Sequence, residues 1–378
     1  HGHGAIENIV PELTARGYKK AFVCSDPDLI KFGVTKKVTD LLDAANFAYS
    51  VYSEIKPNPT IANVQDGVAA FKAAEADCIV AIGGGSVIDS AKAIAMGAAT
   101  GRDPWEFAST GTRPDKTLPV ATVLTLAASG SETSNSCVLT NEETKEKRGI
   151  TSETNRPRIS FLDPENTYTV SKFQTGCGIV DIMMHTLERY LTPEGGESDL
   201  TDRIAEGLLI ATRDAGRRAI ADPRDYEARA TLMWAGSVSH NDYTGCGRKR
   251  LFPVHKLEHE LSAFRDEIAH GAGLSVLFPA WAEHEMQYDY PRFAQFANPV
   301  LGVEMDFEHP ERTAREGIRT LRRFFEEIGM PTHLSQLSIK PENYEKLAAN
   351  TVRTVNGPVK SYSPLDEKAI IEIYRLAE

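Results

Sequence analysis

The chain has few cysteines, no long apolar run and no excess of positive charge, and each absence excludes a class of protein. The 378 residues include five cysteines, far apart and without a CxxC pair, which argues against a disulfide framework or a thiolate zinc site and fits a reducing cytoplasm. No apolar run reaches the roughly 20 residues that span a bilayer, and the start lacks a signal-peptide pattern. The formal net charge of −11 opposes a nucleic-acid or anionic-membrane partner.

The composition is otherwise that of a globular protein, 41% hydrophobic and 25% charged. Single cores stop growing at roughly 250–300 residues, so a chain of this length is expected to form two domains. Residues 1–165 alternate short apolar runs with helical stretches. The expected strands are 20–26, 47–53, 78–82, 120–126 and 159–162, and the expected helices are 34–44, 61–75 and 87–98. This alternation indicates a parallel sheet covered on both faces.

The pattern of apolar residues changes after the loop at 163–166. From 166 to 378 strand candidates are nearly absent and helical apolar spacing recurs. The expected helices are 170–191, 198–219, 225–239, 256–265, 271–286, 312–327, 341–351 and 366–377. The sequence therefore predicts an α/β domain followed by an all-α domain.

A glycine-rich turn follows the third expected strand and opens a helix. In Gly83-Gly84-Gly85-Ser86, backbone N–H groups can approach an anion closely, and the helix N-terminus adds partial positive charge. This suits a pyrophosphate, although the turn is neither GxGxxG nor a P-loop, and it is also compatible with tight packing alone. Asp89, one turn later, either caps the helix, contacts a ribose, or is an exposed helical carboxylate.

Asp26 lies at the end of the first expected strand. A carboxylate there can accept hydrogen bonds from the adenosine ribose, and it would repel a 2′-phosphate and favour NAD over NADP. The alternative is an ordinary turn aspartate before Pro27.

Histidines and one aspartate recur at helical spacing in the second part. Asp181 and His185 are four residues apart, as are His255 and His259, and His270 follows. This spacing places each pair on one helix face. One carboxylate with several imidazoles suits iron or zinc rather than calcium or magnesium, although each pair alone is also typical of a helix surface.

Other acidic and imidazole side chains are harder to assign. Glu188 and Glu258 are either partners that orient metal-bound histidines or solvated helix charges. The remaining histidines beyond the N-terminus look like isolated surface or core residues; these are His240, His284, His309 and His333.

The sequence resembles the iron-containing (group III) alcohol dehydrogenases over essentially its whole length. The motifs that carry the resemblance are 57–60, 83–92, 124–132, 181–190, 233–236 and 255–279. The second half looks most like the butanol dehydrogenase branch, and the first 100 residues look more like lactaldehyde reductase. The chain departs from the family pattern at 247–253, which replaces an aspartate-tryptophan pair, and in a step from His255 to His270 that is one residue longer than usual.

The resemblance implies a Rossmann-like dinucleotide-binding domain at 1–165 and a helical metal-binding, catalytic domain at 166–378. It assigns the metal to Asp181, His185, His255 and His270. It assigns cofactor contacts to Asp26, Asn58, Gly83, Gly84, Ser86, Asp89, Thr125, Ser129 and Lys147. It makes His259 a histidine beside the substrate that can relay a proton.

The implied activity is a metal-dependent, NAD(P)-linked alcohol dehydrogenase or aldehyde reductase. The implied substrate is a small primary alcohol or aldehyde, the cofactors are NAD (NADP as the alternative) and Fe²⁺ (Zn²⁺ as the alternative), and the assembly is a cytoplasmic homodimer. Two rival hypotheses stay open. One is another enzyme on the same fold, a zinc glycerol-dehydrogenase-like polyol oxidoreductase or a dehydroquinate-synthase-like lyase. The other is a non-catalytic descendant that only binds nucleotide.

Overall fold

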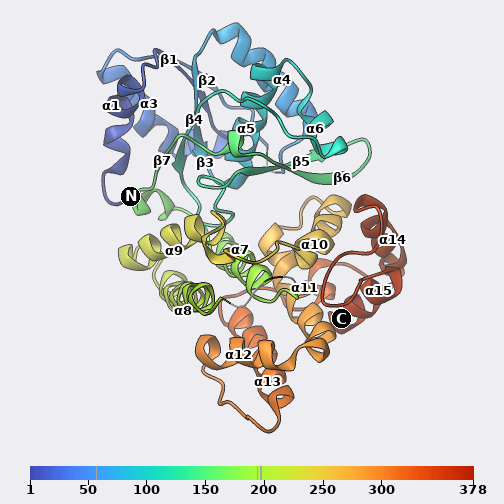
Figure 1. Cartoon of the computed structure of the whole chain (residues 1–378). Helices are drawn as coiled ribbons and strands as arrows, with labels where there is room; N and C mark the ends of the chain where they lie inside the picture. Colours follow the sequence, from blue (N-terminus) through green and yellow to red (C-terminus); the bar gives the residue numbers. More distant parts are fainter. Residues whose placement is uncertain (57, 194, 196–197) are drawn as a thin grey trace. The chain divides into compact units, whose positions relative to one another are not determined.

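The computed structural model describes residues 1–378 except 57, 194 and 196–197. It contains two compact units, His1–Val170 and Ser171–Glu378 (Figure 1). The first is an α/β unit and the second is helical, which confirms the predicted fold class.

A five-stranded parallel sheet forms the centre of the first unit. Its order is β2-β1-β3-β4-β7. The strands are β1 (Lys20–Cys24), β2 (Ala48–Tyr52), β3 (Cys78–Gly83), β4 (Val120–Leu124) and β7 (Ile159–Phe161). Because β2 and β3 lie on opposite sides of β1, the strand order reverses between β1 and β3. Open α/β sheets bind ligands beyond the carboxyl ends of their strands at such a point.

Helices cover both faces of this sheet (Figure 1). They are α1 (Ile9–Ala15), α2 (Pro27–Lys31), α3 (Val34–Ala44), α4 (Ile61–Ala74), α5 (Gly85–Thr100) and α6 (Pro104–Thr110). On one face, Leu13 and Val38 of α1 and α3 share a buried cluster with Val23 and Val80 of the strands. On the other, Phe22 meets Phe71 of α4 edge to face. Successive strand residues therefore alternate between two apolar layers, as a sheet buried on both sides requires.

An antiparallel hairpin of β5 (Ser136–Asn141) and β6 (Glu146–Thr151) was not expected from the sequence. Its strands are mostly polar and half-exposed, and only Cys137, Leu139 and Ile150 are buried hydrophobic residues in it. A pattern this sparse does not stand out against loop composition.

The second unit is helical. Its helix α7 (Lys172–Tyr190) is buried from Thr175 to its end. The others are α8 (Asp199–Ala221), α9 (Tyr226–Ser239), α10 (Pro253–Phe264), α11 (His270–Glu285), α12 (Tyr290–Leu301), α13 (Pro310–Glu327), α14 (Tyr344–Thr354) and α15 (Glu367–Leu376). Helix α7 packs against α8, α9 and α11. All eight expected helices overlap an observed one. Helix α12 was missed; Pro299 lies inside it, and a proline within a helical pattern usually indicates the end of a helix.

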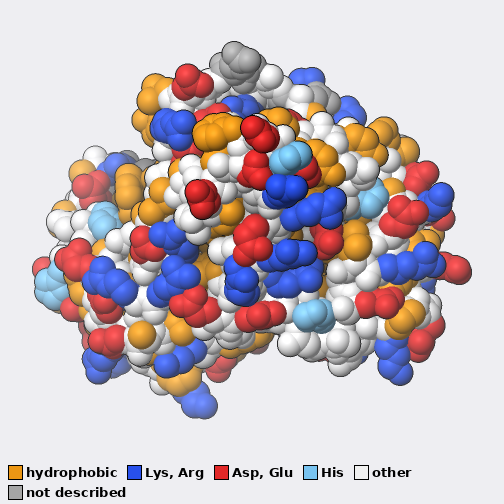
Figure 2. Space-filling model, turned by 90° about the horizontal axis from the view of Figure 1, so that it is seen from below, with side chains coloured by type: hydrophobic (Ala, Val, Ile, Leu, Met, Phe, Trp, Pro, Cys, Tyr) orange, Lys and Arg blue, Asp and Glu red, His pale blue; other side chains and the backbone are white. Residues whose placement is uncertain are grey.

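The surface of the molecule carries both signs of charge. On the face in Figure 2, Lys and Arg side chains are interspersed with Asp and Glu. Within the described residues, no helix combines the length and the apolar character needed to cross a membrane.

Candidate metal centre and cofactor turn

The glycine turn joins β3 to α5 without room for side chains. Gly83 ends β3, Gly84 precedes the helix, and α5 begins at Gly85. A Cβ atom on Gly83 would lie 2.4 Å from Val87, and one on Gly85 would lie 2.6 Å from the Ser129 hydroxyl oxygen. No described side chain caps the helix start. The first N–H groups of α5 are therefore positioned to bind an anion through the backbone.

Two further predicted residues lie beside this turn. Thr125, just after β4, is buried and donates its N–H to the Gly83 carbonyl over 3.2 Å. Ser129 stands against Gly85, and its hydroxyl accepts from the Ser131 N–H over 3.4 Å. The fold thus brings Thr125 and Ser129 to the turn that also carries Ser86. Their contact with a cofactor stays a prediction.

Asp26 follows β1, on the other side of the point where strand order reverses. Its carboxylate accepts from the Leu29 N–H over 2.9 Å and caps α2. The turn role considered for Asp26 is therefore present. Its contact with the adenosine ribose stays a prediction. Capping does not remove the negative charge that a repulsion of a 2′-phosphate would need.

Asn58 and Lys147 are brought together by the fold. The Lys147 ammonium donates to the Asn58 side-chain oxygen over 3.3 Å. The Thr140 N–H donates to the Pro59 carbonyl over 2.7 Å, which ties this loop to β5. Pro57, from the same sequence motif, lies outside the described residues.

Asp89 is not an exposed helical carboxylate, so that alternative is wrong. One oxygen accepts from the Ser131 hydroxyl over 2.5 Å and the other from the Val138 N–H over 2.9 Å. Burial raises the pKa of Asp89, while Lys92 opposes this shift. Asp89 therefore ties α5 to the 131–138 segment, and its predicted ribose contact is untested.

Lys92 is a residue whose role the sequence analysis missed. Its ammonium is buried and donates to four oxygens: the Ser131 carbonyl and hydroxyl and the Ser134 and Ser136 carbonyls, at 2.6 to 3.0 Å. Burial lowers the pKa of Lys92, and the carboxylate of Asp89 opposes this. The sequence did contain a signal for this role, because Lys92 stands among Ala and Ile residues of an apolar helix. In the structure, Lys92 fixes the loop that follows Ser129.

The four predicted metal ligands converge from three helices of the second unit. Asp181 and His185 lie one turn apart on α7, His255 is on α10 and His270 begins α11. The Asp181 Oδ1 atom is 3.4 Å from His185 Nδ1, 3.7 Å from His255 Nε2 and 3.7 Å from His270 Nε2. One carboxylate oxygen therefore faces three imidazole nitrogens.

These atoms have the chemistry that a transition-metal ion requires. Among the described residues, Asp181 Oδ1, His185 Nδ1 and His255 Nε2 are buried and have no hydrogen-bond partner. Buried polar atoms without partners are rare and unfavourable in native proteins. The donor atoms of Asp181, His255 and His270 all lie within 4.8 Å of one another, so a divalent ion among them would satisfy the buried Asp181 and His255 atoms. His185 Nδ1 lies 3.4 Å from Asp181 Oδ1. A donor set of three imidazoles and a carboxylate suits iron or zinc. The residues fit a metal.

Two buried glutamates orient the histidines. Glu188 pairs with His255 Nδ1, and Glu258 pairs with His270 Nδ1, so each histidine directs Nε2 towards Asp181. Such outer carboxylates fix the ring orientation and raise the basicity of metal-bound imidazoles. The alternative that these glutamates are solvated helix charges is wrong, because both are buried.

The electrostatic environment differs between the histidines. Burial, reinforced by neighbouring His240 and His255, lowers the pKa of His185 well below its usual value. Burial also acts to lower the pKa of His255, but the carboxylates of Glu188 and Asp181 outweigh it and raise the pKa to about 9. His185 is thus neutral, the state in which imidazole binds metals.

Three residues around these ligands were not found from the sequence or were misjudged. His240, expected to be isolated, has its ring 4.0 Å from that of His185. The rings of Phe252 and His255 are 5.0 Å apart, and the Arg189 guanidinium lies over Phe252. The contacts of His240 with His185 and of Arg189 with Phe252 join segments far apart in the chain, so no local pattern could have indicated them.

His259, the predicted proton relay, lies next to the ligand group. Its ring centroid is 5.6 Å from that of His270, and Glu258, His259 and His270 form a second group of converging polar atoms. The position suits contact with a substrate bound near His270, and the relay itself is untested.

Family models match nearly the entire chain. The model for iron-containing alcohol dehydrogenase covers residues 1–164, and the C-terminal model of the Fe-containing alcohol dehydrogenase family covers 175–377. The chain belongs to the iron-containing alcohol dehydrogenase family. This confirms the predicted family and the predicted class of enzyme, an alcohol dehydrogenase or aldehyde reductase.

Curated relatives and solved structures agree. The chain is 36% identical to the NADH-dependent butanol dehydrogenase A of Clostridium acetobutylicum, over 99% of this chain and 96% of the relative. It is 29% identical to the lactaldehyde reductase of Escherichia coli K12, over 100% and 96%. The crystal structure of NADH-dependent butanol dehydrogenase A from Thermotoga maritima superposes with a TM-score of 0.94 at 33% identity, covering 100% of this chain and 95% of that one.

Proposed function

We propose that this protein interconverts small primary alcohols and aldehydes, with NADH as the hydride donor and a divalent metal held by Asp181, His185, His255 and His270. The observation that carries the proposal is the set of buried nitrogen and oxygen atoms that face one another without hydrogen-bond partners among the described residues. When bound, the ion supplies Lewis-acid polarisation of the substrate oxygen and the nicotinamide supplies the hydride.

In this proposal, residues of the second unit hold the metal ion and orient its ligands. Asp181 supplies the negative charge, His185, His255 and His270 supply nitrogen donors, and Glu188 and Glu258 keep His255 and His270 turned towards Asp181. His259 lies beside His270, where it can hold or deliver the proton at the substrate oxygen. Iron is the metal we favour, with zinc as the alternative, because this donor set accepts both.

The residues of the first unit bind the cofactor. The N–H groups at the start of α5 hold the pyrophosphate, with Gly83, Gly84 and Ser86 in the turn. The remaining predicted contacts in this proposal are Asn58, Asp89, Thr125, Ser129 and Lys147. Asp26 selects NADH, since its carboxylate repels a 2′-phosphate. The relative named as NADH-dependent supports this choice, although another at 32% identity, from Escherichia coli, is named as NADPH-dependent.

The expected assembly and location complete the proposal. We propose a homodimer in the cytoplasm, which size-exclusion chromatography with light scattering and cell fractionation would test. All five cysteines lie in the described residues and are free thiols, which suits a reducing compartment.

The deciding experiment is aldehyde reduction followed at the nicotinamide absorbance, with NADH and NADPH in parallel. The protein is assayed as purified, after chelation, and after addition of Fe²⁺ or Zn²⁺. We expect turnover that is lost on chelation, restored by metal and faster with NADH. Turnover that ignores the metal, or none with any small aldehyde despite bound metal, contradicts the proposal and leaves the polyol oxidoreductase or the nucleotide-binding descendant.

A further inference from the structure

The four candidate metal ligands are unequally exposed. The side chains of Asp181, His185 and His255 are 6%, 5% and 9% exposed, whereas that of His270 is 27% exposed. Solvent, substrate and chelators therefore reach the ligand group from the His270 side. The side formed by His185 and His255 is covered.

Phe252 and His240 form this cover. The Phe252 ring stands edge-on to His255 at 5.0 Å and to His185 at 6.0 Å between ring centroids. The ring of His240 lies 4.0 Å from His185 and stacks on Phe252 at 6.1 Å. An aromatic side chain placed here excludes water from the two ligands and restricts the movement of their rings.

The backbone of Phe252 is held in an unfavourable conformation. It precedes α10 at φ 51° and ψ 53°, in the left-handed region that bulky residues avoid. Such a conformation persists only where the surroundings impose it. The guanidinium of Arg189 lies 4.8 Å over the ring, and the Glu188 carboxylate accepts from the Val254 N–H over 2.7 Å, so both sides of Phe252 are tied to α7.

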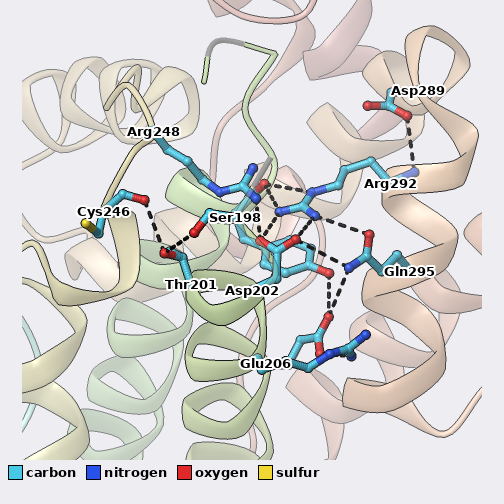
Figure 3. A network of polar contacts seen from close by, with 11 residues as sticks. Ser198, Thr201, Asp202, Glu206, Cys246, Arg248, Asp289, Arg292 and Gln295 are labelled. Carbon is cyan, nitrogen blue, oxygen red and sulfur yellow. Dashed lines mark hydrogen bonds and ion pairs between the residues drawn. The ribbon is translucent and has the colours of Figure 1, made fainter. Parts of the chain in front are cut away.

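The segment that leads to Phe252 is anchored by buried charges (Figure 3). Arg248 pairs with Asp202 of α8, and Arg292 of α12 binds both oxygens of the same carboxylate. The side chains of Arg248 and Asp202 are each 8% exposed. Arg250 adds an ion pair with Asp242 at 2.8 Å, and this pair is exposed. Buried pairs such as that of Arg248 and Asp202 hold a segment in one position, because separating them leaves an unpaired buried charge.

We propose that residues 247–252 form a latch that retains the metal ion. Arg248 positions the segment, and the Phe252 ring restricts the movement of the His185 and His255 rings, which slows the loss of these ligands and therefore the release of the ion through the open side at His270. The inference rests on the metal site of the proposed function. It concerns the rate at which metal leaves, so it can be tested without measuring dehydrogenase activity.

The test uses the full chain loaded with Zn²⁺, and release is followed in an excess of a chromogenic chelator. Phe252→Ala removes the ring. Phe252→Gly removes the ring and also relieves the left-handed backbone, so the pair separates the effect of the ring from that of the strain. Phe252→Trp keeps an aromatic cover, and Phe307→Ala is the matched control, because Phe307 is 89% exposed.

We expect Phe252→Ala and Phe252→Gly to release metal about ten-fold faster or more, the range typical of changes to groups that support metal ligands. Phe252→Trp and Phe307→Ala should release it at the wild-type rate. Arg248→Met should accelerate release to a smaller degree, and its fold should survive, because Arg292 still neutralises Asp202. Circular dichroism confirms folding, and if Phe252→Ala does not fold, Phe252→Gly and Arg248→Met decide.

Release at the wild-type rate from the folded Phe252 and Arg248 variants overturns the latch. Fast release from Phe252→Ala together with wild-type release from Phe252→Gly overturns it as well, because the cause is then backbone strain. A wild-type protein that binds no Zn²⁺, Fe²⁺ or Co²⁺ contradicts the metal site itself, and the proposed function fails with it.

Discussion

The glycine turn proposed to bind the cofactor and the candidate metal centre differ in how each would bind a charged group. The turn works by leaving side chains out: Gly83 and Gly85 have no space for a Cβ atom, and backbone N–H groups are presented to the ligand. The metal centre instead buries Asp181, His185 and His255, whose polar atoms face one another. The first arrangement is local, within one strand–helix junction, and the second depends on three helices meeting.

This difference predicts how the two sites fail. A substitution in the turn adds a side chain where backbone N–H groups are expected to bind the cofactor. Its effect on cofactor binding should therefore be partial, and metal binding should not change. A change in the metal centre removes a donor that the other ligands require, so its effect approaches all or none.

The largest effect is expected from Asp181→Ala. The Asp181 oxygen lies within 3.7 Å of ring nitrogens of three histidines, so its loss should abolish metal binding. Activity should fall about a thousand-fold or more, because a Lewis-acid metal contributes several kcal/mol to the transition state. Atomic absorption measures the metal content, and the aldehyde-reduction assay measures the activity. His309→Ala, at a half-exposed histidine, should change neither; a metal-replete, active Asp181→Ala would remove Asp181 from the ligand set.

A second substitution tests whether the first unit also depends on a buried charge. Lys92→Met removes the ammonium that four loop oxygens share and leaves Asp89 without its nearest cation. The free energy of unfolding should fall by about 3–5 kcal/mol, as when one partner of a buried pair is lost. Urea denaturation measures it, with Lys36→Met at an exposed i,i+4 pair as the control. Equal stabilities of the two variants would show that the loop is held by other contacts.

The cofactor turn itself is tested by Gly83→Ala. The added Cβ would overlap Val87, so the turn must shift. We expect the KM for NADH to rise about ten-fold with little change in kcat, and overpacking to lower stability by about 1–3 kcal/mol. Gly207→Ala is the control, because Gly207 lies in α8 with nothing within 4 Å of the added atom, and it should stabilise by about 0.5–1 kcal/mol. An unchanged KM would mean that the cofactor binds elsewhere.

The smallest effect is expected from Asp26→Ser. Serine can still cap α2 by accepting from the Leu29 N–H, so stability should hold while the negative charge is removed. The ratio of kcat/KM for NADPH to that for NADH should rise about ten-fold, which corresponds to about 1.4 kcal/mol. Steady-state kinetics with both cofactors measure the ratio. If this ratio does not change, another residue determines the choice of cofactor.

Much of the molecule could be predicted because its signals are short-range. The strands of the five-stranded sheet and helices α3, α4 and α5 follow apolar runs and their spacing, whereas the short helices α1, α2 and α6 were not expected. The pairs Asp181/His185 and His255/His259 show helical spacing. The β5–β6 hairpin was missed because its strands are polar, and α12 because Pro299 lies inside it. In both cases tertiary packing stabilises an element that its own residues only weakly favour.

The sequence by itself determined the fold class, the family and the residues that carry ligand chemistry, because periodicity and motif spacing depend on neighbours along the chain. Only the tertiary structure decided how those residues are used. It buried Glu188 and Glu258 behind two of the histidines, set Lys92 under a loop of the first unit, and placed His240 and Phe252 against the ligands. Burial and contact arise between segments distant in the chain. Whether a carboxylate orients a ligand or is solvated follows from that packing.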